Sequence, residues 1–327
     1  MNIKHQLIKR LNLSKVLWPT LNNGLYCFNF HRIGAWQETS FDPCVFSCDA
    51  ENFEKYIFFI KNNFRIVSID DIKNIIEKNM PINEKLALIT FDDGYSDNYH
   101  VAYPILRSLG LPATFFITTS LIDSNLIPWW DEIAWHVRQL ANKTIKLTPW
   151  QQALTIDKTP SRQNIRNVLK NVKRDPSLIE SQLNELRELT SATIPHNKMK
   201  NVFMTWQQVA EMANNNMTIG AHSHTHKVFS CLSEADLNFE LKESKRLIEH
   251  KLSNTIDSLS YPVGNSTTYN KSMYGTISSH GYKLAFSFNA RINNNLSENR
   301  FAIGRFPIDR PFDARIFKEM ILSAKSK

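Results

Sequence analysis

Two short segments, far apart in the chain, carry residues whose types and spacing could do chemistry together. The run Thr90-Phe91-Asp92-Asp93-Gly94-Tyr95 places two adjacent carboxylates directly after the apolar residues 86–89, which are typical of a buried strand. Buried charges are costly unless they have a partner or a task. The run 222–226, His-Ser-His-Thr-His, supplies imidazoles after a second apolar segment. One carboxylate and two imidazoles can hold a divalent metal, and the remaining carboxylate can then move protons.

The spacing of His222 and His226 suits a pair of metal ligands. Residues four apart share a side both in a helical turn and in an extended segment, and three protein ligands leave positions open for water. A His-x-x-x-His pattern alone is often structural, but here both clusters follow strands, where parallel α/β folds gather their ligand sites. We therefore expect one joint site of Asp93, His222 and His226. His224 could join it in an extended segment, but a turn, which we favour, would point it away.

Strand-like and helix-like segments alternate from residue 24 onward. This alternation predicts a parallel sheet covered by helices and closed into a barrel. Helices are expected near residues 49–62, 98–109, 205–214 and 233–252, from residue 70 onward, and before residue 280. Strands are expected near residues 25–30, 65–68, 86–91, 113–117, 217–221, 259–261, 284–288 and 301–305.

The alternation is interrupted between about residues 125 and 201. This stretch is polar and basic with a helical pattern, so it predicts a helical insertion or lid on a catalytic domain of residues 24–327. It opens with Trp129, Trp130 and Asp131; these could line a sugar site or begin a helix that anchors the insertion, and both readings remain open. Residues 1–23 are expected to form a basic amphipathic helix, packed on the domain or lying on a membrane surface.

Composition narrows the class of protein and of partner. The 327 residues are 42% hydrophobic and 21% charged, with no apolar run long enough to span a membrane and no recognisable secretory signal. We expect a cytoplasmic enzyme, with peripheral contact at the inner membrane face as a further hypothesis. The net charge of +8 favours an anionic partner, such as a sugar diphosphate, an acidic glycan or phospholipid headgroups, or merely keeps the protein soluble. Scattered basic residues without a known motif argue against nucleic acid.

The four cysteines do not have zinc-finger spacing. Free thiols are expected, with Cys27 and Cys231 in the core, although an even number leaves disulfides open. The remaining two are Cys44 and Cys48.

The two chemical runs resemble the first two motifs of the polysaccharide deacetylases, carbohydrate esterase family 4 with its NodB-homology domain. Tyr261-Pro262-Val263-Gly264 resembles the third motif, and the resemblance covers about residues 24–124 and 202–310. It implies a distorted (β/α) barrel with fewer than eight strands. It also implies a divalent metal, most commonly Zn²⁺, on Asp93, His222 and His226, with Asp92 as general base. The backbone N–H of Val263 would stabilise the oxyanion.

The chain also departs from the family pattern. Ser260 stands where many members carry an arginine, and no histidine follows His280, so the usual C-terminal general acid is missing. His31, at the end of the first strand, is the best substitute acid, against the alternative of a buried structural histidine. Arg305 could replace the missing arginine and orient Asp92, or form an ordinary salt bridge. Tyr261, Trp129 and Trp130 are candidate substrate contacts.

The resulting hypothesis is a metal-dependent deacetylase that removes N-acetyl groups from a polysaccharide or a lipid-linked glycan precursor. A deformylase, an O-deacetylase or another amidohydrolase on the same scaffold remains an alternative, as does a catalytically inactive glycan-binding protein. A two-carboxylate glycosidase is disfavoured, because Asp92 and Asp93 are adjacent and neighbouring strand residues point apart.

Overall fold

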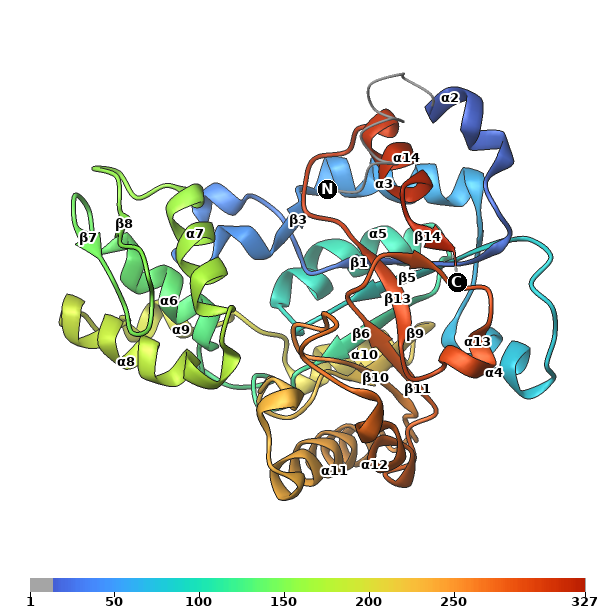
Figure 1. Ribbon diagram of the computed structural model, residues 1–327. Coiled ribbons are helices and arrows are strands. Elements are labelled where there is room, and N and C mark those ends of the chain that lie inside the picture. Colours follow the sequence, from blue (N-terminus) through green and yellow to red (C-terminus); the bar gives the residue numbers. More distant parts are fainter. Residues whose placement is uncertain (1–13, 327) are drawn as a thin grey trace.

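A closed barrel of parallel strands forms the centre of the molecule (Figure 1). The computed structural model describes residues 14–326. The strands follow one another around the barrel in chain order, and β13 pairs with β1 to close it. They are β1 (Gly24–Phe30), β5 (Lys85–Phe91), β6 (Ala113–Ile117), β9 (Met217–Ala221), β10 (Ser258–Ser260), β11 (Leu284–Ser287) and β13 (Ile303–Pro307). β4 (Arg65–Ile66) pairs only with the start of β5. The prediction of a barrel with fewer than eight strands is confirmed.

Alternation along the strands sorts side chains between the barrel interior and the surrounding helices. Tyr26 and Phe28 of β1 belong to the large outer core, whereas Leu25 and Cys27 pack in a separate inner cluster. In the same way Leu86 and Leu88 of β5 join the inner cluster. Since the side-chain period of a strand is two, Asn29, Thr90 and Asp92 continue the inner row. The strands therefore deliver polar groups to the carboxyl end of an otherwise apolar interior.

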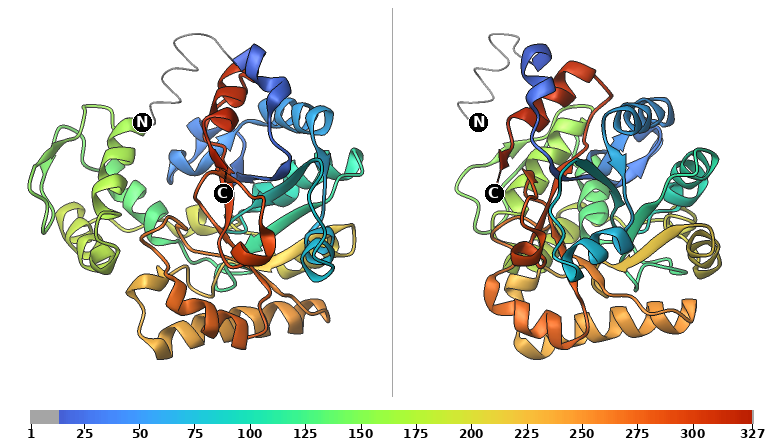
Figure 2. Two further views of the ribbon diagram at one scale, coloured as in Figure 1. Left: turned by 45° about the vertical axis from the view of Figure 1, so that its right-hand side comes forward. Right: turned by 90° about the vertical axis from the view of Figure 1, so that its right-hand side faces the viewer.

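Helices cover the outside of the barrel (Figure 2). Several begin with the caps that the sequence indicates: the Asp49 side chain accepts from the Asn52 N–H, and Ser233 accepts from the Asp236 N–H. The covering helices are α3 (Ala50–Asn63), α4 (Ile69–Glu77), α5 (Tyr103–Ser108), α10 (Trp206–Ala213), α11 (Glu234–Leu252), α12 (Tyr274–Ser279), α13 (Leu296–Asn299) and α14 (Ala314–Leu322). The helix predicted over 98–109 begins with a π-helical turn, η4 (Asn98–Ala102), before α5.

The polar stretch between β6 and α10 forms a lobe beside the barrel, green to yellow in Figure 1. It has an apolar core of its own, built on Ile133, Ile165 and Leu183, with Val45 packed against it. Its elements are α6 (Trp129–Arg138), β7 (Thr144–Ile145), β8 (Leu154–Thr155), α7 (Arg162–Val172), η5 (Pro176–Leu178), α8 (Ile179–Thr190) and α9 (His196–Met199). We refer to this segment as the helical lobe.

Short elements complete the chain, and some sequence expectations change here. Most of the predicted N-terminal helix falls on residues 1–13, outside the described residues; α2 (Ser14–Leu17) and η1 (Trp18–Thr20) follow it. The four cysteines are free, but Cys231 is exposed, so its placement in the core was wrong: it ends the turn η6 (Phe229–Cys231), in which Phe229 fills the core instead. No helix within residues 14–326 has the length and apolar character needed to cross a membrane. The others are β2 (Arg32–Ile33), η2 (Trp36–Glu38), η3 (Pro43–Val45), β3 (Phe46–Cys48), η7 (Lys271–Met273), β12 (Arg291–Ile292) and β14 (Lys325–Ser326).

Candidate active site

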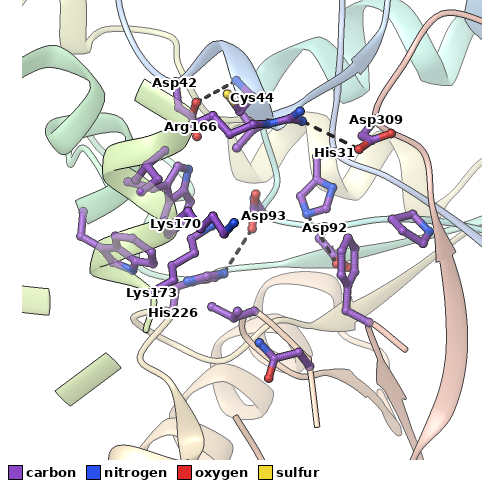
Figure 3. A pocket seen from close by; sticks show the side chains of 18 of the residues that line it. His31, Asp42, Cys44, Asp92, Asp93, Arg166, Lys170, Lys173, His226 and Asp309 are labelled. Carbon is purple, nitrogen blue, oxygen red and sulfur yellow. Dashed lines mark hydrogen bonds and ion pairs between the residues drawn. The ribbon is translucent and has the colours of Figure 1, made fainter. Parts of the chain in front are cut away.

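A cavity of about 480 Å³ opens at the carboxyl ends of the barrel strands (Figure 3). Both chemical segments of the sequence reach it: β5 runs into Asp92 and Asp93, and β9 runs into His222 and His226. The helical lobe and the loops after β10 and β11 supply further walls. The joint site expected from the strand ends is therefore one cavity.

Asp93, His222 and His226 form a compact cluster of potential metal ligands. Their candidate ligand atoms all lie within 4.8 Å of one another. Asp93 Oδ1 is 3.5 Å from His222 Nε2 and 3.5 Å from His226 Nε2. His224 is not part of the cluster, because its Nδ1 lies 2.9 Å from Thr119 Oγ1 instead.

The donor set fits a divalent cation. His222 Nδ1 lies 2.9 Å from the Ser260 carbonyl oxygen, so an N–H at Nδ1 leaves the Nε2 lone pair directed at the cluster. His226 Nδ1 is buried without a partner among the described residues. Burial lowers the pKa of both imidazoles, which favours their neutral, ligating form. Burial and the neighbouring charges of Asp92 and Asp131 raise the pKa of Asp93, a cost that a bound cation would offset.

Backbone conformations in these loops are strained in a way that the sequence alone does not show. Asp93, His226 and Val263 have φ values of 75°, 58° and 62°. Such values are uncommon outside glycine and are a marked departure for a β-branched residue such as Val263. Gly94 has φ of 91°, and a Cβ there would lie 2.9 Å from Ile122 Cδ1, so this position requires glycine. Strain of this kind concentrates at functional sites, because the surroundings must hold it.

Asp92 is held by a buried arginine clamp. Arg305 NH1 and NH2 donate to Asp92 Oδ1 and Oδ2, each at 2.8 Å, and Asn29 Nδ2 donates to Oδ2 at 3.1 Å. Arg305 also donates to Ser260 Oγ at 2.7 Å. Burial by itself would raise the pKa of Asp92, but the charge and hydrogen bonds of Arg305, with His222, lower it well below its usual range. Asp92 is therefore ionised.

His31 lies beside the clamped carboxylate. Its Nε2 is 3.9 Å from Asp92 Oδ2, and its side chain keeps 23% exposure to the cavity. Burial lowers the pKa of His31 to about 4, against the opposing charge of Asp92. His280, by contrast, caps its own helix through the Thr276 carbonyl oxygen. Among residues 14–326, His31 is the one cavity-lining imidazole outside the ligand cluster.

The three aromatic candidates, Trp129, Trp130 and Tyr261, line the same cavity but differ in how much side-chain surface is left for a substrate. Trp130 is buried; its ring centroid lies 4.3 Å from that of His226, and its Nε1 donates to Tyr95 Oη at 2.7 Å. Tyr261 is also buried, stacked on Tyr269 and donating to the Phe301 carbonyl oxygen. Trp129 is half-buried. Most of the surface of Trp130 and Tyr261 is thus used in packing.

Sequence reasoning missed several residues that build the site. Asn29 bridges Arg305 and Asp92, accepting from Arg305 NH1 at 2.6 Å. A polar residue near the end of an apolar strand, two positions before His31, was the available signal. Ser260 was noted only as a missing arginine, yet its carbonyl and hydroxyl oxygens contact His222 and Arg305.

Comparison with known proteins places this architecture in a family. A profile of the family described as polysaccharide deacetylase matches residues 79–285, more than half of the chain. The poly-beta-1,6-N-acetyl-D-glucosamine N-deacetylase of Escherichia coli (strain K12) is 27% identical over 113 residues, which cover 34% of this chain and 16% of that protein. The matched segments span at most 24% of the length of the curated relatives.

Two solved structures share the fold at low sequence identity. The deacetylase PplD of Streptococcus pyogenes, in complex with acetate, has a TM-score of 0.58 at 17% identity, covering 91% of this chain and 98% of that one. IcaB from Ammonifex degensii has a TM-score of 0.57 at 15% identity, covering 93% and 99%. These structures agree in fold with the profile match over residues 79–285, which shows that the chain belongs to the polysaccharide deacetylase family.

Proposed function

We propose that this protein is a metal-dependent N-deacetylase that acts on an N-acetylated glycan. The observation that carries the proposal is that two adjacent carboxylates have different partners. Arg305 binds Asp92 through two hydrogen bonds, while Asp93 clusters with His222 and His226. Family membership supports deacetylation, and the name of the Escherichia coli relative supports an N-acetylhexosamine glycan as substrate.

Asp93, His222 and His226 would hold the cation, most simply Zn²⁺ given two imidazoles and one carboxylate. When bound, the cation would lower the pKa of a water toward neutrality and polarise the acetamide carbonyl. The protein's own contribution is orientation, since the Ser260 carbonyl fixes the His222 ring and Trp130 packs on His226.

Asp92 accepts the proton that water loses as its oxygen attacks the acetamide carbon. The hydrogen bonds from Arg305 keep Asp92 ionised and fix its orientation. Because they also lower its pKa, Asp92 is a weak base. Breaking the C–N bond releases acetate and an amine, and that amine needs a proton. His31, 3.9 Å from Asp92 and neutral in the free protein, is placed to receive the proton from Asp92 and deliver it to the leaving nitrogen.

Val263 and the half-buried Trp129 both line this cavity. The N–H of Val263, in its left-handed conformation, would donate to the oxyanion. The face of Trp129 would support a sugar ring. Contact with a lipid-linked precursor at the inner membrane face is part of the same proposal, motivated by the net charge of +8.

Product analysis on a panel of N-acetyl, N-formyl and O-acetyl glucosamine oligomers tests this proposal. Acetate and free amine should appear in equal amounts from the N-acetyl substrate with the wild type, and Asp92→Asn should lower the rate by a factor of about 10² to 10⁴. Formate or ester cleavage as the dominant product would favour the alternative chemistries. Sugar binding without any turnover or bound zinc would favour an inactive glycan-binding protein.

A further inference from the structure

One wall of the cavity is basic, and the mechanism proposed above does not use it. Arg166 and Lys170 on α7 and Lys173, the C-cap residue that follows it, are spaced four and three residues apart, which places them on one side of the helix. The opposite face of α7 packs Ile165 and Val168 into the core of the helical lobe. All three cations line the cavity that holds Asp92 and Asp93. Figure 3 shows Lys170 and Lys173 across it from His31, whereas Arg166 reaches toward Asp309.

These cations are only weakly neutralised by the protein. Arg166 NH2 lies 3.8 Å from Asp309 Oδ2 at the rim. Lys173 Nζ lies 5.5 Å from the ring centroid of Trp129, and neither it nor Lys170 forms an ion pair with any residue from 14 to 326. Four carboxylates line the cavity, and each has another partner. Arg305 clamps Asp92, and two imidazoles face Asp93. Asp42, which also feels the charge of Lys173, accepts from the Cys44 N–H, and Asp309 pairs with Arg310. The basic face is therefore available to a ligand.

The field of Lys173 reaches the reaction centre. Its charge lowers the pKa of Asp93 and of His226, although burial dominates both groups. A row of cations on a helix usually faces bulk water, which solvates the charges without any protein partner. These three side chains are also exposed, but they border a concave surface shared with the catalytic groups, where charge is screened less than on an open surface.

We propose that Lys170 and Lys173, with Arg166 at the rim, form a subsite for an oxyanion, a carboxylate or a phosphate, carried by the glycan next to the acetamido sugar. This inference rests on the proposed function and names its substrate class as an anionic glycan. Deacetylation yields an amine that is cationic at neutral pH, and the basic wall repels it. The same wall discriminates against segments that have already lost acetyl groups.

The test compares ligands that differ only in charge. Binding is measured with Asp92→Asn for a tetrasaccharide of alternating N-acetylglucosamine and glucuronate, and for its twin with each carboxylate reduced to an alcohol. UDP-N-acetylglucosamine is the phosphate-bearing arm, with N-acetylglucosamine as its neutral reference. The double variant Lys170→Gln/Lys173→Gln should lower the charged-to-neutral affinity ratio about tenfold. The ratio should also fall with added salt.

Lys158→Gln/Arg174→Gln removes two charges beside the same helix, at positions that do not line the cavity, and serves as the matched control. It should leave the ratio within about twofold of the parent. A preference for the glucuronate arm identifies a carboxylate subsite, and a preference for the nucleotide arm identifies a phosphate subsite. Equal affinity for charged and neutral twins, including no binding of either, would overturn the inference. Acetate release from the neutral oligomer separately decides the proposed function.

Discussion

Two adjacent buried carboxylates have pKa values that their neighbours shift in opposite directions. Burial acts on both Asp92 and Asp93 in the same direction, raising the pKa. Arg305 reverses the effect at Asp92, whereas Asp93 meets other carboxylates and neutral imidazoles. Pairs of titratable groups whose surroundings drive their pKa values apart are how active sites divide roles.

Replacing Arg305 tests the clamp. Arg305→Lys keeps the charge but cannot donate to both carboxylate oxygens in parallel, so the Asp92 carboxylate should lose its fixed orientation. We expect kcat to fall about 10- to 100-fold with unchanged zinc content, measured by acetate release and metal analysis. Ser260→Ala, which removes only one acceptor of Arg305, is the control and should have a smaller effect. Wild-type kcat in Arg305→Lys would contradict the orienting role.

The pH profile tests the part taken by His31. Because burial lowers its pKa to about 4, the imidazole is neutral from about pH 5 upward. If it receives its proton during turnover, kcat/KM shows no loss as pH rises from 4.5 to 6.5. If the free protein had to supply a protonated His31, activity would decline tenfold per pH unit in this range. His31→Asn should lower kcat by about 10²-fold or more.

At the scale of elements, the strands were the most predictable parts. Apolar runs bounded by turn residues predicted the ends of the seven barrel strands to within about two residues. Strands buried on both faces leave a continuous apolar signal in the sequence. The π-helical turn at η4 and the exposed position of Cys231 were not predictable. Both depend on tertiary packing around short segments that carry no periodic pattern.

The helical lobe contains a pH-sensitive tie between α6 and α8. Arg187 Nε and NH2 donate to Glu132 Oε1 and Oε2 at 2.7 and 2.9 Å. Burial opposes ionisation of Glu132, but hydrogen bonds from His136 and Arg187 prevail and lower its pKa to about 2. A lowered pKa in the folded state contributes stability that is present above about pH 4.5 and lost as pH falls toward 2.

Thermal unfolding from pH 7 to pH 2.5, followed by tryptophan fluorescence of the lobe, measures this contribution. Glu132→Gln should be less stable at pH 7 by on the order of 2 kcal/mol, and the gap to wild type should narrow below pH 4. A gap that stays constant across this range would show that the tie does not titrate as described.

At the scale of the whole molecule, the site combines what could and could not be predicted from sequence. The proximity of Asp92, Asp93, His222 and His226 followed from motif residues at strand ends. The Arg305 clamp was foreseen only as one option, because its 213-residue separation from Asp92 is bridged by barrel closure alone. The bridge through Asn29 was missed, although a polar residue within an apolar strand was a local signal. The basic character of residues 125–201 was noted, but nothing local to Arg166, Lys170 or Lys173 shows that they line the cavity.

Metal binding should stabilise the whole barrel, since the ligands come from β5 and β9 and only the folded chain brings them together. Zn²⁺ at 100 times its dissociation constant should add about 2.7 kcal/mol to the free energy of unfolding and raise Tm by several degrees. His226→Ala should abolish the shift, whereas His224→Ala should keep it. A shift of equal size in both variants would place the metal elsewhere.

The proposed function requires that Asp93, His222 and His226 bind a metal on which N-deacetylation depends. The most direct measurement is acetate release from an N-acetylglucosamine oligomer while Zn²⁺ is titrated into chelator-treated protein. We expect no release without metal, a rise that saturates near one Zn²⁺ per chain, and no rise in His226→Ala. Undiminished acetate release from the metal-free protein would contradict it.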